Sequence, residues 1–232
     1  MTKRLDGLYT DESASVTQAS AHIAERSKAA GKRLFDIVFG LCMLVVFSPL
    51  MLLIAVMIRY NDGGPIIFAH TRIGRNGRQF KCLKFRTMVT NADERLEKIL
   101  EESPEARSEW ETFRKLKNDP RIIPHIGSRL RKSSLDELPQ ILNVIRGDMS
   151  IVGPRPVVSE ELVQYGALAS AYMQHRPGLT GPWQIGERSD TSFETRVKLD
   201  AQYMDSWTLI DDMRIAAKTA KMILSGRSNG AY

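Results

Sequence analysis

The chain has 232 residues, of which 43% are hydrophobic and 26% charged, with a formal net charge of +6. This composition excludes a disordered protein, and the positive charge favours an anionic partner such as a lipid headgroup or a nucleotide. Solubility alone explains so modest a charge equally well. No nucleic-acid-binding motif is present, so nucleic acid is not an expected partner. Two distant cysteines do not indicate a disulfide framework, which is typical of a reducing compartment.

The N-terminal region precedes a long apolar segment. Residues 1–19 are rich in Ser, Thr and Asp and show no apolar period, which predicts a flexible tail. Residues 22–33 carry several cations and predict a short surface helix suited to anionic headgroups. A solvated linker fits the same residues.

The segment Ile37–Ile58 contains 22 residues without a charge. A straight helix of this length crosses a hydrocarbon core of about 30 Å. Pro49 predicts a kink at mid-depth, and the Ser48 hydroxyl is suited to bond a carbonyl that the kink frees. Lys and Arg flank both ends, so charge asymmetry assigns no orientation. On the residues alone, the pattern favours a spanning helix with a prolyl kink.

The remaining chain predicts a mainly α fold with one short β-hairpin. Residues 66–69 and 79–83 read as strands, and Asn76-Gly77 between them is a hairpin signal. A charged helical region over residues 91–117 has a break at Pro104. Further helices are expected over residues 134–145, 159–173 and 192–204. The amphipathic helix from Leu209 onward either packs on the domain or lies in a membrane interface.

The candidate chemistry centres on Asp136-Glu137. Ser134 and Glu137 have the spacing of a capping box, which explains the pair as the start of a helix. Several cations in nearby motifs favour phosphate binding instead: Lys84, Arg86, Arg129, Arg131, Lys132 and Arg155. Carboxylates among such cations suit a magnesium-bound diphosphate, and an aspartate is able to attack phosphorus.

Four ordered motifs resemble one known family. Residues 84–88 (KFRTM), 130–140 (LRKSSLDELPQ), 149–156 (MSIVGPRP) and 176–181 (RPGLTG) are similar to the bacterial sugar transferases, the monotopic phosphoglycosyl transferases that begin exopolysaccharide and O-antigen synthesis. The resemblance extends from Lys32 to about Leu224. It is strongest to short exopolysaccharide initiators that load galactose phosphate.

The resemblance implies transfer of a hexose 1-phosphate from a UDP-sugar to undecaprenyl phosphate, with release of UMP. Asp136 matches the nucleophile that forms a phosphosugar-enzyme intermediate, and Glu137 matches its partner. Both acids are implied ligands of Mg²⁺. The implied phosphate and nucleotide contacts are Lys84, Arg86, Arg131, Arg155 and Arg188.

The resemblance also implies a topology. A re-entrant helix-break-helix at Ser48-Pro49 would keep both its ends at the cytoplasmic face of the bacterial inner membrane, which replaces the spanning interpretation. The chain then divides into the tail 1–19, the surface and re-entrant helices 20–60, and a cytoplasmic catalytic domain 61–232, with amphipathic helices at the interface. Self-association is left open.

One departure from the family pattern concerns the donor sugar. Relatives carry a Ser-Gly-Arg-Asn-like run where this chain has Gly186-Glu187-Arg188-Ser189. The alternatives to galactose-phosphate transfer are a glucose 1-phosphate donor, transfer of the sugar alone with release of UDP, and a non-catalytic basic membrane scaffold.

Overall fold

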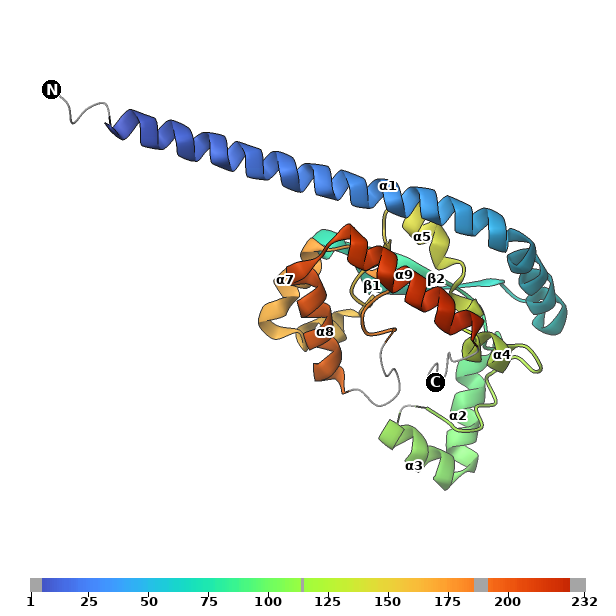
Figure 1. Cartoon of the computed structure of the whole chain (residues 1–232). Coiled ribbons are helices and arrows are strands. Elements are labelled where there is room, and N and C mark those ends of the chain that lie inside the picture. The colour runs from blue at the N-terminus through green and yellow to red at the C-terminus, as the bar shows by residue number, and fades with distance from the viewer. Residues whose placement is uncertain (1–5, 114, 186–191, 226–232) are drawn as a thin grey trace.

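The computed structural model describes residues 6–113, 115–185 and 192–225. Helix α1 (Asp6–Asp62) lies along one side of a domain formed by the other described elements (Figure 1). Residues 6–19, predicted as a flexible tail, instead form the first turns of α1, and residues 22–33 continue the same helix. Extending a helix adds one hydrogen bond per residue fixed, which is why no separate surface helix forms.

The apolar part of α1 is one continuous helix. Residues Ser27–Asp62 are long and apolar enough to cross a membrane, by length and composition. Pro49 lies inside the helix, and the Ser48 hydroxyl donates a hydrogen bond to the Val45 carbonyl at 3.0 Å, as predicted. Figure 1 shows α1 bending toward its C-terminal end. The prolyl position therefore lies in a bent helix, and helical hydrogen bonding continues beyond it.

The predicted hairpin is confirmed. Strands β1 (Ile67–Ile73) and β2 (Gln79–Phe85) pair antiparallel across the 3-10 turn η1 (Arg75–Gly77). Asn76 and Gly77 have φ angles of 59° and 70°, the left-handed conformation that this dipeptide favours. In the resulting register Lys84 faces Phe68 on the neighbouring strand.

The helices in the rest of the domain agree in part with those predicted from the sequence. The break at Pro104 separates α2 (Ala92–Glu102) from α3 (Pro104–Phe113), as predicted. The later helices α8 (Phe193–Ser206) and α9 (Leu209–Leu224) are also confirmed. The other elements are the helices α4 (Gly127–Lys132), α5 (Gln140–Arg146), α6 (Ser159–Val163) and α7 (Ala169–Gln174), the 3-10 turns η2 (Leu135–Glu137) and η3 (Gly166–Leu168), and the parallel strands β3 (Ser150–Val152) and β4 (Gly178–Thr180).

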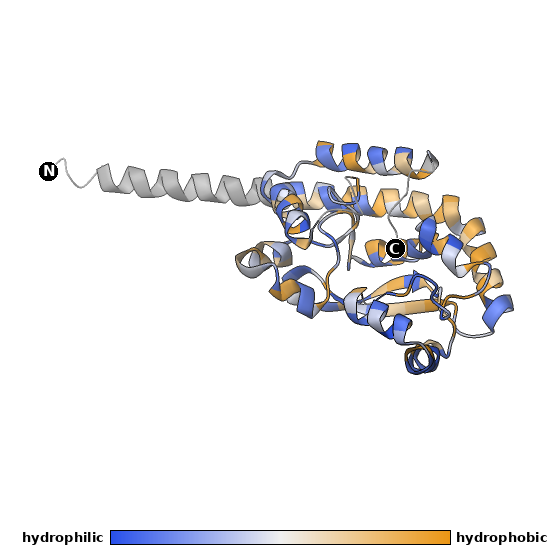
Figure 2. Cartoon of the chain, turned by 90° about the horizontal axis from the view of Figure 1, so that it is seen from below, coloured by the Kyte–Doolittle hydropathy of each residue, from blue (hydrophilic) through white to orange (hydrophobic). Residues whose placement is uncertain are grey.

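Two hydrophobic clusters form the core. One gathers around β3, with Met149 and Tyr172 fully buried. The other joins the C-terminal part of α1, through Ile54 and Ile58, to the segment that carries α4 and α5, including Ile141. Hydrophobic residues also continue along α1 outside these contacts (Figure 2). The end of the apolar helix is thus packed into the domain.

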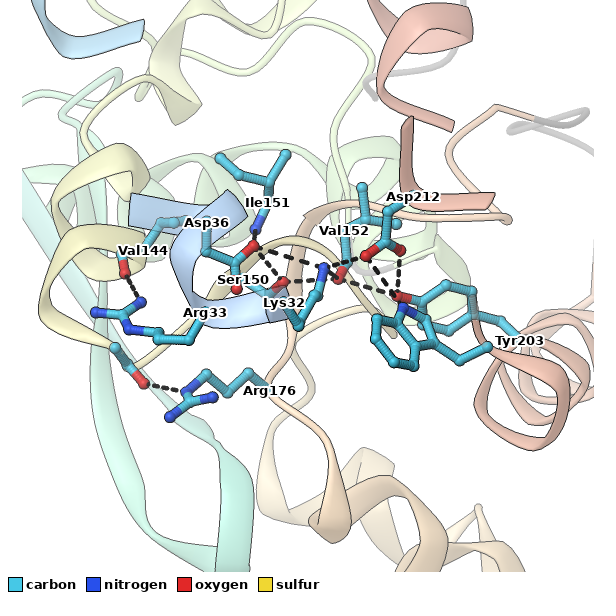
Figure 3. Close-up of polar contacts among 12 residues, drawn as sticks. Lys32, Arg33, Asp36, Val144, Ser150, Ile151, Val152, Arg176, Tyr203 and Asp212 are labelled. Atoms are coloured by element: carbon cyan, nitrogen blue, oxygen red, sulfur yellow. Dashed lines mark hydrogen bonds and ion pairs between the residues drawn. The ribbon is translucent and has the colours of Figure 1, made fainter. Parts of the chain in front are cut away.

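The start of the apolar helix is held by polar contacts. The Lys32 ammonium lies 2.5 Å from an Asp212 carboxylate oxygen and 3.5 Å from Asp36, and it donates to the Val152 carbonyl (Figure 3). Arg33 donates to the carbonyls of Val144 and Ile145 at the C-terminus of α5. Both ends of the apolar segment therefore contact the same domain.

Candidate active site

The acidic pair does not lie in a capping box. Ser134 has φ 56°, its side chain makes no capping hydrogen bond, and its N–H instead bonds the Arg131 carbonyl. Ser134 thus follows the end of α4 in the left-handed conformation common just after helices. Asp136 and Glu137 lie in the 3-10 turn η2, and α5 begins only at Gln140. The single helix predicted over residues 134–145 is therefore wrong, and so is the capping explanation of the pair.

Asp136 is the buried member of the pair. Its residue is 9% exposed. Burial raises the pKa of Asp136 to about 6, with Glu137 adding to the rise while Lys84 and Arg131 oppose it. A carboxyl group with this pKa is mainly ionised at neutral pH, and it is more basic than an ordinary aspartate. Both properties suit a nucleophile.

Lys84 provides a cation beside both acids. Its ammonium lies 2.6 Å from a carboxylate oxygen of Glu137. Burial lowers the pKa of Lys84, but the negative charges of Glu137 and Asp136 outweigh this and raise it. The side chain is therefore charged at neutral pH. β2 supplies this cation and η2 the acids, so the long-range packing of these two elements creates the cluster.

Arg131 supports the same cluster from α4. Its Nε donates to the Thr87 hydroxyl at 2.9 Å. This bond fixes one edge of the guanidinium group. The charge of Arg131 also acts on Asp136, as its opposing effect on the pKa of that acid shows. Two of the predicted phosphate contacts, Lys84 and Arg131, therefore lie near Asp136.

Arg86 is held by contacts within the protein. It is 8% exposed and forms an ion pair with Asp62 at the end of α1. It also donates to the carbonyls of Pro65 and Met88. These contacts bind the end of α1 to the strand that carries Lys84. The structure thus shows a scaffolding role for Arg86, and its phosphate contact stays a prediction.

Arg155 lies in the loop that follows β3. Its N–H donates to Asp200, and its guanidinium stacks on the Trp183 ring at 5.0 Å from the ring centroid. The charges of Lys84, Glu137 and Arg155 all act on the buried Cys82 thiol of β2. Arg188, also predicted at the site, lies outside the described residues.

The Asn143 side chain was missed by the sequence reasoning. It is 1% exposed; its amide oxygen accepts from the Leu83 N–H, and its amide nitrogen donates to the Lys81 carbonyl. A buried amide that satisfies a strand edge fixes α5 against β2. The asparagine gave no sequence signal, because its partners on β2 are about 60 residues away and belong to the backbone.

The donor set around the acidic pair fits magnesium only together with a substrate. No cluster of three or more His, Cys, Asp or Glu side chains occurs among the described residues. Asp136 and Glu137 provide two adjacent carboxylates. Mg²⁺ commonly takes one or two carboxylates and completes its shell with phosphate oxygens and water. The residues present therefore fit a magnesium-diphosphate complex.

Comparisons with known proteins identify the family of this chain. Residues 27–226 match the model of the bacterial sugar transferase family. The chain is 51% identical to the exopolysaccharide production protein ExoY of Rhizobium meliloti, over 87% of this chain and 88% of the relative. It is 49% identical to the undecaprenyl-phosphate galactose phosphotransferase of Salmonella typhimurium, over 91% of this chain but 44% of that longer protein. It is 46% identical to the UDP-galactose-lipid carrier transferase of Erwinia amylovora, over 94% of this chain and 45% of the relative. A match over this share of the residues shows that the chain belongs to the bacterial sugar transferase family.

Proposed function

We propose that this enzyme is a phosphoglycosyl transferase that moves a hexose 1-phosphate from a UDP-sugar to undecaprenyl phosphate and releases UMP. The observation that carries the proposal is the burial of an ionised aspartate, Asp136, between the cations Lys84 and Arg131 in a member of the sugar transferase family. Exopolysaccharide synthesis is the process named for one similar relative, and lipid-carrier transfer for two others.

The reaction has two displacements at one phosphorus atom. An Asp136 carboxylate oxygen attacks the sugar-bearing phosphorus of the donor, and the bond to the UMP oxygen breaks. A phosphate oxygen of undecaprenyl phosphate then attacks the same phosphorus and releases the aspartate. A covalent intermediate lets a soluble donor and a lipid acceptor use one pocket in turn.

The neighbouring side chains stabilise charge during both steps. Lys84 supplies a positive charge beside the acidic pair, and the guanidinium of Arg131 suits phosphate oxygens. Asp136 and Glu137 would hold Mg²⁺, which supplies further charge neutralisation on the diphosphate when bound. The ion pair with Lys84 also orients Glu137 toward the site, where it is placed to assist the acceptor phosphate.

We place the site at the cytoplasmic face of the inner membrane, on a re-entrant α1. Two contacts support this: Lys32 binds β3 near the start of the apolar segment, and Ile58 packs into the domain near its end. A straight spanning helix would take one of these ends to the far side of the bilayer. Cysteines introduced near residue 20 should react with a membrane-impermeant reagent only after the cells are opened. Labelling from the periplasm would contradict the re-entrant arrangement.

The reaction is tested by the nucleotide released from UDP-galactose, with undecaprenyl phosphate and Mg²⁺ present. Wild type should release UMP, and Asp136→Asn should release none while it stays folded, because asparagine has the same size and lacks the nucleophilic charge. Asp93→Asn in the exposed first turn of α2 is the matched control and should retain activity. Release of UDP would show transfer of the sugar alone. Absence of any nucleotide release by wild type would favour a non-catalytic scaffold.

The donor is proposed as UDP-galactose because two similar relatives carry galactose in their names. UDP-glucose is the alternative, and parallel reactions with both donors decide between them. A higher kcat/KM for UDP-glucose would contradict the galactose assignment and leave the reaction class intact.

A further inference from the structure

An aromatic pair on the hairpin lies beside Lys84. In the register of β1 and β2, Phe68 is directly opposite Lys84, and His70 is directly opposite Cys82. Residues opposite one another in an antiparallel pair project from the same face of the sheet, with their Cβ atoms about 4.5–5.5 Å apart. Phe68 is therefore a direct neighbour of the cation that pairs with Glu137.

The two rings are stacked and open to solvent. The ring centroids of Phe68 and His70 lie 6.2 Å apart, with an angle of 17° between the ring planes. Phe68 is 51% exposed, and His70 is exposed as well. A lone exposed phenylalanine is ordinary on a protein surface, but this ring lies next to the candidate active site and is stacked on a second ring. We call Phe68 and His70 the aromatic strip.

Charged side chains lie at both ends of the aromatic strip. Lys84 is beside Phe68, and Arg72, two residues beyond His70 on the same face of β1, pairs with Glu161 of α6 at 3.3 Å. Burial lowers the pKa of His70 from its ordinary value, and the neighbouring cations Arg72 and Lys84 add to this fall. The charge of Glu161 opposes it. His70 is therefore mainly neutral at neutral pH, so the strip presents two uncharged rings between two cations.

We propose that the aromatic strip binds the uracil ring of the UDP-sugar, with Phe68 as the stacking surface. The inference rests on the proposed function, since that reaction brings the donor diphosphate to Asp136 and Lys84. A base stacks on an aromatic side chain through its flat face. Uracil is the flat aromatic group of the donor, whereas the hexose is bonded to the phosphorus that Asp136 attacks. The strip is therefore suited to the nucleotide part of the donor.

The order of the elements matches the direction in which UMP leaves. The Asn143 side chain of α5 bonds the Leu83 N–H of β2, so α5 and β1 lie at opposite edges of this strand. The turn η2, which carries Asp136, directly precedes α5 and meets β2 through Lys84. Attacking and leaving oxygens lie roughly in line at phosphorus, so the leaving UMP is directed away from Asp136. The strip on β1 lies beyond β2 in this order of elements.

The test uses the full-length protein and combines a change of residue with a change of ligand. Calorimetry measures the binding of UMP and of dihydro-UMP, whose saturated base is no longer flat or aromatic. We expect Phe68→Ala to weaken UMP binding about tenfold, as the loss of a base–aromatic contact does. Dihydro-UMP should bind wild type more weakly than UMP does, and this difference should disappear in Phe68→Ala. Phe68→Leu, which keeps apolar bulk, should also lose the difference, and Phe68→Tyr should retain it.

Ile67→Ala is the matched control. Ile67 is 40% exposed and adjacent to Phe68, and its side chain projects from the opposite face of the hairpin. This control should leave UMP binding and the KM for UDP-galactose unchanged. Phe68→Ala should raise the KM for UDP-galactose and leave the KM for undecaprenyl phosphate unchanged.

The outcomes separate the uracil site from the proposed function. Equal binding of UMP and dihydro-UMP by wild type, or an equal loss of both in a folded Phe68→Ala protein, would overturn the site. A rise confined to the KM for undecaprenyl phosphate would also overturn it and would assign Phe68 to the lipid chain. If wild type shows no turnover but binds UMP through Phe68, the uracil site holds and the proposed function fails.

Discussion

The contact between Lys32 and two buried carboxylates allows a quantitative test of how the apolar helix α1 is held against the domain. Asp36 and Asp212 are both 0% exposed, and Lys32 is the cation that bridges them. Lys32→Met keeps most of the apolar stem and removes the ammonium group. Both carboxylates then stay buried without an opposing charge. We expect the variant to be strongly destabilised.

The size of the destabilisation depends on the hydrogen bonds that each carboxylate keeps in the variant. Breaking a buried ion pair by removing one partner costs about 3–5 kcal/mol. Asp36 still accepts from the Ser150 hydroxyl, and Asp212 still accepts from the Tyr203 hydroxyl at 2.7 Å, so we expect a value near the lower end. For a chain of this size each kcal/mol shifts Tm by about 2–4 °C. The expected decrease in Tm is therefore about 6–12 °C.

The assay is thermal unfolding in detergent, followed by tryptophan fluorescence, since the Trp207 indole donates to Asp212. Adding Asp212→Asn to Lys32→Met should recover part of the loss, because one of the two unpaired charges is removed. Lys28→Met, an exposed cation one turn earlier on α1, is the control. If Lys32→Met changes Tm no more than this control does, or if the second substitution recovers nothing, the buried pairing does not stabilise the fold.

Three further predictions concern single residues. Burial raises the pKa of Asp200 to about 6, so the folded protein binds a proton there more tightly than the unfolded chain does. The contribution of this group to stability should fall by at most about 3 kcal/mol as pH rises from about 4 to 6. Asp200→Asn should make Tm depend less steeply on pH in this range, and the part that comes from Asp136 should remain. Gly153→Ala should lower Tm and turnover together, because its new methyl group would meet the Arg176 carbonyl at 2.4 Å, whereas Gly31→Ala, with open space around it, should not lower Tm. Arg86→Gln should lower Tm by several degrees and leave the KM for UDP-galactose unchanged, because Arg86 pairs with Asp62; a higher KM at unchanged Tm would restore its predicted phosphate contact.

Local signals predicted much of the fold. Asn76-Gly77 adopts the left-handed turn that its residue types favour, and Pro104 separates two helices as expected. These features depend on residues adjacent in the sequence. The resemblance supplied the candidate nucleophile, Asp136, and two nearby cations.

Ser134 shows where local reasoning failed. A serine three residues before a glutamate fits a capping box, but the same serine also follows α4. In the structure Ser134 follows the C-terminal end of α4 and does not cap a later helix. Local spacing could not decide this, because the outcome depends on how η2 packs against β2, where Lys84 meets Glu137. The ion pair of Arg86 with Asp62 at the C-terminal end of α1 likewise depends on packing between elements, which the residues around Arg86 do not reveal.

The two ends of the apolar helix contact two different segments of the candidate site, the one that carries the acidic pair and the one that leads to Arg155. Ile54 and Ile58 pack in the cluster that includes Leu138 and Ile141, beside the acidic pair. At the other end Lys32 donates to the carbonyl of Val152, the residue just before the loop that carries Arg155. One bent helix thus contacts both the segment beside the acidic pair and the strand that leads into the loop of Arg155. By these contacts α1 helps to hold the two segments in place, so its apolar part contributes to the structure of the candidate active site.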